Sequence, residues 1–493
     1  MKPNLPLLTG SLLIFVSGAI LAQDEAAVPP APEDTQVPVA EEGLAEDALA
    51  TVPEVDEEEL LLSEFSRFKM LVEQGSLDEA DTVAKRIIEI AIRAKGPQSN
   101  EMAKALTNLA IVQHRSNEFE AAQQNYQSAI EIIEENEDRL NVQLVNPLKG
   151  LAAAQLESGR PDLATATYGR AVHVTHVNEG PHNLMQVNLL EDLAEVKLRM
   201  GDLDSARDVQ ETIYALNARA HRNDALGLIP ALMKRAEWQH RAGLIFDERA
   251  TYRRVIRIIQ QRLGKEDLAL VEPLIRLGRS FFFVDLSGDT SYMNSTATSG
   301  EIYFKQALRI SKENPDTTWR IIADATLALG DYYMYEGNSQ RARHVYDEAW
   351  ELLSTPEYRA EKLNFRSSEL ESSVVLRRLP VAQYVGESDP RAGATPDDPA
   401  QKGTVSVTYG ISPQGRTGNV QIIEAIPPEF VAMQQSVGRE VRRRLYRPRF
   451  QDGEPIETTG HVSVHTYWYK QSDLDAAREA ALSSGDDAGN DDT

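Results

Sequence analysis

The chain has 493 residues and a formal net charge of −25, because 76 aspartates and glutamates outnumber 51 lysines and arginines. So negative a chain repels phosphate backbones, and we expect no nucleic-acid partner. The absence of cysteine excludes disulfides and a lipidated N-terminal cysteine, and it leaves the compartment undecided on redox grounds.

An apolar run stands near the start of the chain. Residues 5–22 are mainly apolar, follow Lys2, and end at Ala22 just before the acidic Asp24 and Glu25. This is the pattern of a secretory signal, so we predict that residues 1–22 are a signal peptide and that the protein is exported. The same run is just long enough to remain uncleaved as a membrane anchor, and this alternative stays open.

Two acidic segments flank the rest of the chain. Residues 23–59 contain several prolines but no lysine or arginine, so they cannot bury enough apolar surface to fold. We predict a disordered, self-repelling linker there. Residues 471–493 are also acidic and are predicted to be a disordered tail, although Leu474 to Leu482 could form a short helix.

A spacing of 42 residues runs through the middle of the chain. It separates turn residues in sequences such as GSLDEA and GDLDSA, with an alanine seven residues before four of them and a tyrosine nine residues after four. A small residue at a fixed position lets two helices approach closely, so each unit is predicted to be helix, tight turn, helix. The last step is ten residues longer, and we assign the excess to a polar insertion at 287–300. The turn residues are Gly75, Asn117, Gly159, Gly201, Gly243 and Gly337, the alanines are Ala110, Ala152, Ala194 and Ala236, and the tyrosines are Tyr126, Tyr168, Tyr252 and Tyr346.

This pattern resembles the tetratricopeptide repeat, in the longer form found in kinesin light chains. Gly96, Gly180 and Gly264 fit the helix-ending position of alternate repeats. The resemblance implies six or seven units between residues 60 and 353, forming an all-α solenoid. Its concave face would bind an extended peptide or a protein element.

The connector at 354–402 is predicted to begin as a helix through Phe365 and Leu370. It then contains SVVLRRLPVAQYV, in which residues 374–385 could dock as an extra strand on the domain that follows. The connector ends in a segment rich in proline and aspartate.

Residues 403–470 are predicted to form a small domain with the order β-β-α-β. Residues 404–411 alternate between apolar and small polar side chains, the period of a half-buried strand. A second strand is predicted over 419–426, and a third over 461–469. Between them, apolar residues at spacings of three and four form one stripe of a helix that can lie on the sheet. These are Phe430, Met433, Val437 and Val441.

Two segments of this domain resemble the C-terminal domain of the TonB family. Residues 412–423 resemble the family's strand-turn-strand, with Gln414 where the family usually has Asp, and residues 437–448, with Tyr446 and Pro448, resemble its helix end. Members of this family carry inner-membrane energy across the periplasm to outer-membrane receptors of Gram-negative bacteria. The resemblance implies a fold whose last strand holds a short segment of a receptor.

If this chain uses its last strand as the family does, the partner-binding residues lie on that strand. Two other interpretations stay open, because an edge strand can complete the domain's own sheet or pair with a second copy in a homodimer. The predicted partner-binding residues are His461, Val462, Ser463, Val464, His465, Thr466, Tyr467, Trp468 and Tyr469.

A cluster of arginines makes the domain locally basic. Arg439, Arg442, Arg443 and Arg444 are predicted to form a basic face that could steer an acidic partner. A solvated helix surface that offsets the acidic segments is the more common explanation for such a cluster.

Little in the sequence points to catalysis. His173 and His176 share a helix face near His182, but no acidic third ligand or HExxH pattern supports a metal site. There is no phosphate-binding glycine loop and no nucleophile elbow. We therefore predict no enzyme activity, no metal and no cofactor.

The combined prediction is a periplasmic protein-interaction scaffold with a TonB-like C-terminal domain. That domain would engage an outer-membrane receptor or another envelope protein by strand addition, in or alongside TonB-dependent transport. One alternative is an energy transducer held at the inner membrane by an uncleaved N-terminal helix. Another is an envelope assembly factor whose C-terminal domain is structural or dimerising.

Overall fold

The computed structural model describes residues 56–283, 300–377, 394–395 and 397–486. The predicted signal peptide, nearly all of the predicted linker, most of the predicted insertion and residues 487–493 lie outside the described residues. Within the described part, no helix is both long enough and apolar enough to cross a membrane.

The chain divides into two compact units, residues 1–154 and 155–493. The described part of the first unit is helical, with α1 to α4 packed in succession and an apolar core shared by α1, α2 and α3. Its helices are α1 (Glu57–Gln74), α2 (Leu77–Lys95), α3 (Asn100–Arg115), α4 (Phe119–Asn136), η1 (Val142–Leu144) and α5 (Val145–Glu157), of which α5 crosses the boundary.

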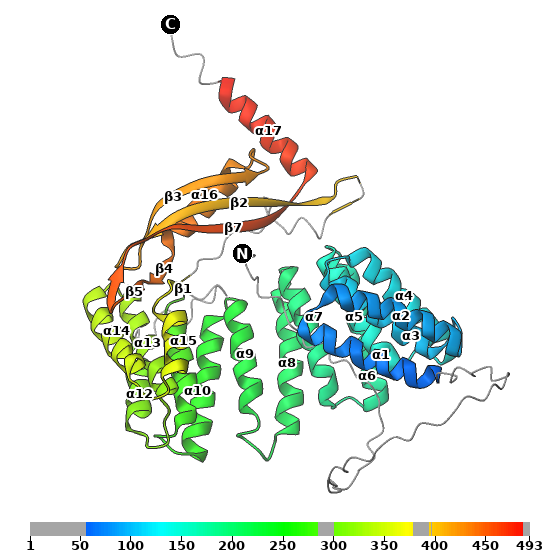
Figure 1. Cartoon of the computed structure of the whole chain (residues 1–493), viewed down its shortest axis with the longest axis horizontal. Coiled ribbons are helices and arrows are strands. Elements are labelled where there is room, and N and C mark those ends of the chain that lie inside the picture. The colour runs from blue at the N-terminus through cyan, green and yellow to red at the C-terminus, as the bar shows by residue number, and fades with distance from the viewer. Residues whose placement is uncertain (1–55, 284–299, 378–393, 396, 487–493) are drawn as a thin grey trace, which may run out of the picture. The chain divides into compact units, whose positions relative to one another are not determined.

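The second unit continues the helical pattern. In chain order, six pairs of helices between α1 and α14 are joined by described tight turns, while most of the connection between α11 and α12 lies outside the described residues. Figure 1 shows successive helices from α8 to α14 standing side by side. The helices are α6 (Pro161–Glu179), η2 (Leu184–Gln186), α7 (Val187–Arg199), α8 (Leu203–Ala220), α9 (Ile229–Arg241), α10 (Ile245–Arg262), η3 (Leu268–Leu270), α11 (Val271–Ser280), α12 (Glu301–Glu313), α13 (Trp319–Tyr335) and α14 (Ser339–Ser354).

The residues that mark the 42-residue spacing lie in the tight turns, as predicted. All six, from Gly75 to Gly337, have φ between 65° and 81°. This left-handed region is open to glycine, which has no Cβ, and is tolerated by asparagine. At Gly201 the turn is closed by hydrogen bonds from the Gly201 and Asp202 amides to the carbonyls of Leu198 and Lys197.

Replacing Gly201 by alanine is therefore expected to lower the free energy of unfolding by about 1–2 kcal/mol. Gly169 is the matched control, because it lies inside α6 and an added Cβ would meet open space. Gly169→Ala is expected to raise the free energy of unfolding by about 0.5–1 kcal/mol. Urea denaturation measures both changes, and effects of the same sign would contradict this explanation of the turn.

The repeated tyrosines and small residues pack between neighbouring helices. Tyr126 and Tyr346 are almost fully buried, and their rings lie on Gly150 and Gly330 of the neighbouring helix. A Cβ at Gly150 would lie 2.2 Å from the ring of Tyr126, and one at Gly330 would lie 2.4 Å from the ring of Tyr346. The predicted alanines, such as Ala110 and Ala236, are also completely buried. Small residues are thus required where a ring or a helix approaches closely.

The second unit ends in a small α+β domain with the predicted order of strands and helix. Three strands form an antiparallel sheet in the order β3-β2-β7, and α16 packs on β2 and β3 with its predicted apolar stripe buried. Figure 1 shows the long strands lying alongside one another with α16 on the sheet. The elements are α15 (Arg359–Glu369), β1 (Val374–Arg377), β2 (Ala400–Ile411), β3 (Thr417–Ile426), α16 (Val431–Arg443), β4 (Leu445–Arg447), β5 (Arg449–Gln451), β6 (Glu454–Ile456), β7 (Thr458–Lys470) and α17 (Gln471–Asp486).

The connector contains the predicted helix, α15, and a short strand, β1. This strand pairs antiparallel with β4, so it does not extend the three-stranded sheet. The remaining residues of the predicted strand, 378–385, lie outside the described residues.

The prediction of a disordered tail from residue 471 is wrong for its first part. Residues 471–486 form helix α17, which directly follows β7. Leu474 is buried and Ala477 is partly buried against the core of the sheet domain. The first turns of α17 therefore pack an apolar face on that core, although the segment is acidic.

Candidate partner-binding surfaces

The predicted partner-binding residues lie on an edge strand. β2 is the central strand of its sheet, and it pairs with β7 along most of the length from Thr458 to Lys470. Among the strands that the structure describes, β2 is the sole neighbour of β7. Residues 461–469 therefore lie where a further strand could be added.

The buried face of β7 carries aromatic side chains, and its exposed face carries valines. His465, Tyr467 and Tyr469 are buried, with the ring centroids of Tyr467 and Tyr469 at 5.9 and 5.2 Å from that of Phe430. Val462 and Val464 are instead 60% and 52% exposed. The aromatic residues fill the space under α16 because they are larger, and their burial raises the pKa of Tyr467 to about 12.

Chemically, the edge of β7 offers backbone groups flanked by exposed apolar side chains. In an antiparallel pair, alternate residues direct their N–H and C=O groups toward the neighbouring strand, and the others direct them away from it. An extended segment can bind the outward groups, while pockets or faces beside the strand select its side chains. The exposed valines of β7, Val462 and Val464, lie beside such a segment. The arrangement suits recognition of a peptide backbone.

Three of the four arginines assigned to the basic face are exposed. Arg439, Arg442 and Arg443 are exposed on α16, but Arg444 is buried. Its guanidinium donates two hydrogen bonds of 2.8 Å to Glu440 and lies 3.1 Å from a ring nitrogen of His465. Desolvation opposes its charge, but the hydrogen bonds and charges of Glu440 and Tyr446 together outweigh that effect and raise the pKa of Arg444. Placing Arg444 on the basic face was wrong because it follows the end of the helix.

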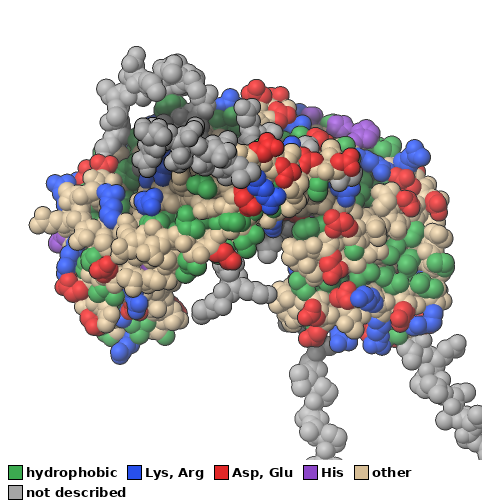
Figure 2. All heavy atoms as spheres, turned by 90° about the horizontal axis from the view of Figure 1, so that it is seen from above, with side chains coloured by type: hydrophobic (Ala, Val, Ile, Leu, Met, Phe, Trp, Pro, Cys, Tyr) green, Lys and Arg blue, Asp and Glu red, His purple; other side chains and the backbone are tan. Residues whose placement is uncertain are grey.

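Acidic and basic side chains are interspersed over the face of the molecule seen in Figure 2. The exposed arginines of α16 thus lie on a chain whose surface carries both positive and negative charges. Their contribution to steering an acidic partner is screened over about 8–10 Å at physiological ionic strength.

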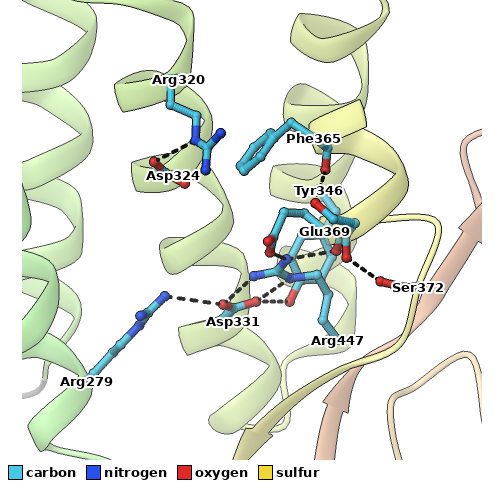
Figure 3. A network of polar contacts seen from close by, with 10 residues as sticks. Arg279, Arg320, Asp324, Asp331, Tyr346, Phe365, Glu369, Ser372 and Arg447 are labelled. Carbon is cyan, nitrogen blue, oxygen red and sulfur yellow. Dashed lines mark hydrogen bonds and ion pairs between the residues drawn. The ribbon is translucent and has the colours of Figure 1, made fainter. Parts of the chain in front are cut away.

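A buried ion pair joins the sheet domain to the last helix pair (Figure 3). Arg447 of β4 donates from Nε and Nη2 to the two carboxylate oxygens of Asp331 on α13, at 2.8 Å each. Its Nη1 donates to the carboxylate and the main-chain carbonyl of Glu369, and Tyr346 donates its hydroxyl to Asp331 at 2.9 Å. The side chains of Arg447 and Asp331 are 3% and 4% exposed.

Asp331 affects the pKa of both Arg447 and Tyr346. Desolvation would lower the pKa of Arg447, but the attraction and hydrogen bonds of Asp331 outweigh it and raise that pKa. Burial raises the pKa of Tyr346 well above its usual value, and the charge of Asp331 adds to the effect. Arg447 therefore stays charged and Tyr346 stays a neutral donor near neutral pH.

Apolar contacts surround the ion pair. Leu445 and Phe450 are buried in the core of the last helix pairs, and the ring centroid of Phe450 lies 5.6 Å from that of Tyr346. The Phe450 amide also donates to the carbonyl of Leu370. We call Asp331, Tyr346, Glu369, Arg447 and Phe450 the joint. It makes the sheet domain and the last helices one packed body.

Sequence reasoning missed the joint, although one signal was present. Asp331 is the lone charged residue in ATLALGDYYMY, a stretch of α13 that is buried on nearly all sides. A charge in such a helix requires a partner. The sequence does not show that this partner lies more than a hundred residues away.

The histidines considered as metal ligands do not form a site in the described residues. His173 and His176 are exposed on α6, and His182 is exposed in the turn after it. The described part of the chain has no group of three or more histidines, aspartates or glutamates that could hold a metal ion.

Comparison with known families gives two matches. Residues 69–135 match the tetratricopeptide repeat, and residues 398–465 match the Gram-negative bacterial TonB protein C-terminal family. The first match runs from the end of α1 through α4, and the second runs from β2 into β7. Both resemblances seen in the sequence are thereby confirmed, as is the fold class of stacked helix pairs followed by a small α+β domain.

Solved structures similar to this chain share little sequence identity with it. A Podosopora anserina protein with nearly identical TPR-like repeats is 14% identical, with a TM-score of 0.38, and the match covers 42% of this chain and 98% of that one. The apo form of RapI is 12% identical, with a TM-score of 0.35 and coverage of 62% and 99%. A tetratricopeptide repeat protein from Parabacteroides merdae is 15% identical, with a TM-score of 0.33 and coverage of 62% and 97%. A search of curated proteins finds no match.

Proposed function

Because the chain joins a tetratricopeptide region to a TonB C-terminal domain, we propose that it is a protein-interaction scaffold of the Gram-negative envelope. The repeat array recruits one protein partner. The C-terminal sheet binds a segment of an outer-membrane receptor or another envelope protein by strand addition at β7, in or alongside TonB-dependent transport. The observation that carries this proposal is the edge position of β7, which has β2 alone as a neighbour among the described strands.

The exposed side chains of β7 support the same proposal. Val462 and Val464 would otherwise present apolar surface to water, and a strand added at the edge would cover part of it. A second copy of the chain is the competing occupant, since two edge strands can also pair with each other.

Photocrosslinking in a Gram-negative host tests which occupant is present. A photoreactive amino acid at Val464 is expected to crosslink to an envelope protein, and the crosslinked peptide is expected to lie in an extended N-terminal segment of that protein. Val431 on α16 is the matched control, because it is also an exposed valine of this domain. Crosslinks only to a second copy of the chain, or identical partners from both positions, would contradict strand addition.

The protein is proposed to act in the periplasm after removal of residues 1–22. The alternative is an energy transducer that keeps this segment as an inner-membrane anchor. Intact mass after cell fractionation separates the two. A soluble periplasmic species that begins at Gln23 is the expected result, and a full-length species in the inner membrane would favour the transducer.

The joint favours a second candidate function, an assembly factor whose C-terminal domain is structural. A sheet domain that buries an ion pair against the array could serve to complete the last repeat. In that case blocking the edge of β7 would leave partner binding unchanged.

A further inference from the structure

A cavity of about 1000 Å³ lies where the repeat array meets the joint. Its walls come from α9, α11 and α13 of the array, from α15, and from β1 and β4. The lining combines apolar side chains such as Ile275 and Phe282 with charged ones such as Arg276 and Arg279. Its volume lies at the upper end of the range for ligand-binding clefts, roughly 300–1,000 Å³, so it can hold a short stretch of peptide.

One wall of the cavity is a strand with an open edge. Val374, Val375 and Leu376 of β1 line the cavity, and among the described strands β1 pairs with β4 alone. The edge opposite β4 therefore has backbone groups that no described strand uses. Val375 is also 43% exposed, although it sits beside a large apolar lining. An extended backbone laid along β1 would satisfy both features.

Another wall carries an arginine whose nearest carboxylate is 4.0 Å away. Arg279 of α11 reaches toward Asp331 (Figure 3), but the two groups are 4.0 Å apart. Asp331 already accepts two hydrogen bonds of 2.8 Å from Arg447 and one from Tyr346. Desolvation lowers the pKa of Arg279 despite the charge of Asp331. The side chain of Arg279 is 46% exposed, and the carboxylate nearest to it already accepts hydrogen bonds from Arg447 and Tyr346.

Most of the other charged groups that line the cavity have closer partners. Arg241 is paired with Glu195 at 2.7 Å, and Arg320 bonds to Asp324 at 3.4 Å while its guanidinium stacks on Phe365. On the acidic side, Glu248 lies 3.0 Å from His240, and Glu369 bonds to Arg447. Arg276 lies 3.6 Å from Glu272. Arg279 is therefore the lining cation with the weakest contact among the described residues.

From these features we propose that the cavity binds an extended peptide segment bearing a carboxylate side chain. The peptide backbone pairs with the open edge of β1, and the carboxylate accepts hydrogen bonds from Arg279. This proposal deepens the proposed protein-binding role of the array, and its site is separate from β7. Because β1 is held by β4 next to the joint, the site is complete only when the sheet domain is docked on the array.

The test begins with a random peptide library displayed on phage and selected on the full-length protein. Enriched peptides are expected to share an Asp or Glu among β-branched residues. Arg279→Gln is expected to weaken their binding about 10- to 100-fold, because a charge-assisted hydrogen bond is lost. Val375→Asp is expected to weaken it similarly by repelling the carboxylate.

Matched controls are Arg309→Gln and Val431→Asp, which change an exposed arginine and an exposed valine outside the cavity. Neither control is expected to change binding more than about twofold. Replacing the acidic residue of the selected peptide by its amide should weaken binding to the native protein and have little effect on the Arg279→Gln variant. Hydrogen exchange should show protection of β1 when the peptide is bound.

The proposal is overturned if no peptide is enriched. It is also overturned if the enriched peptides bind the two cavity variants as tightly as they bind the two control variants. It is also overturned if the selected peptides bind through β7, which a blocked β7 edge would reveal. Loss of binding at β7 with retained binding at the cavity would instead remove the proposed function and leave this site standing.

Discussion

Replacing Arg447 by methionine is expected to lower the free energy of unfolding of the second unit by about 3–5 kcal/mol. The substitution leaves the Asp331 carboxylate, which is 4% exposed, without its two shortest hydrogen bonds. Arg279, at 4.0 Å, is too distant to replace them. Urea denaturation followed by tryptophan fluorescence measures the loss, with Trp350 in α14 and Trp468 in β7 reporting on the two sides of the joint.

Arg343→Met is the matched control for this prediction. Arg343 pairs with Asp347 and Glu454, but its side chain is 43% exposed, and exposed pairs contribute at most about 1 kcal/mol. Adding Asp331→Leu to Arg447→Met is expected to recover much of the stability, since a buried pair can often be replaced by apolar groups. Equal losses for Arg447→Met and Arg343→Met would contradict the buried joint.

The second large effect is expected from a pair of prolines in β7. Ser463→Pro and Val464→Pro each remove one backbone N–H, and successive residues of an edge strand direct these groups to opposite sides. One variant therefore loses a hydrogen bond to β2 and is destabilised. The other loses an outward group and blocks an added strand, so it is expected to bind the envelope partner about 100-fold more weakly while unfolding near the native midpoint.

The two prolines control for each other, because they are adjacent and chemically identical. Unfolding midpoints identify which of them faces β2, and binding of the crosslinked partner segment is then measured for both. If the proline that preserves stability also preserves binding, strand addition at β7 is wrong and the assembly-factor function is favoured.

The repeat architecture was predictable because its signal is local and recurs. A left-handed glycine or asparagine recurs at the tight turns, and a tyrosine follows four of them at a fixed distance, so the 42-residue spacing identifies the helix pairs. The apolar stripe of α16 was predictable for the same reason, since its four residues repeat at helical spacing and are buried together.

The features that the sequence did not predict depend on contacts between different segments of the chain. The arginines of α16 look alike in sequence, yet Arg444 turns inward to Glu440 because the helix has ended. Alternation in β7 does not say which face is buried, and that choice depends on Phe430. The pairing of Asp331 with Arg447 and of β1 with β4 has no local signature beyond a lone charge in an apolar helix.

Hydrogen exchange of the full-length protein, with and without the crosslinked partner segment, tests the central claim most directly. Strand addition predicts that the partner slows exchange of alternate backbone amides along residues 461–469, because these amides gain hydrogen bonds that β2 does not supply. The same amides should remain unprotected in the proline variant that blocks the edge. Protection confined to the repeat array, with β7 unchanged, would contradict the claim that the sheet edge is the partner site.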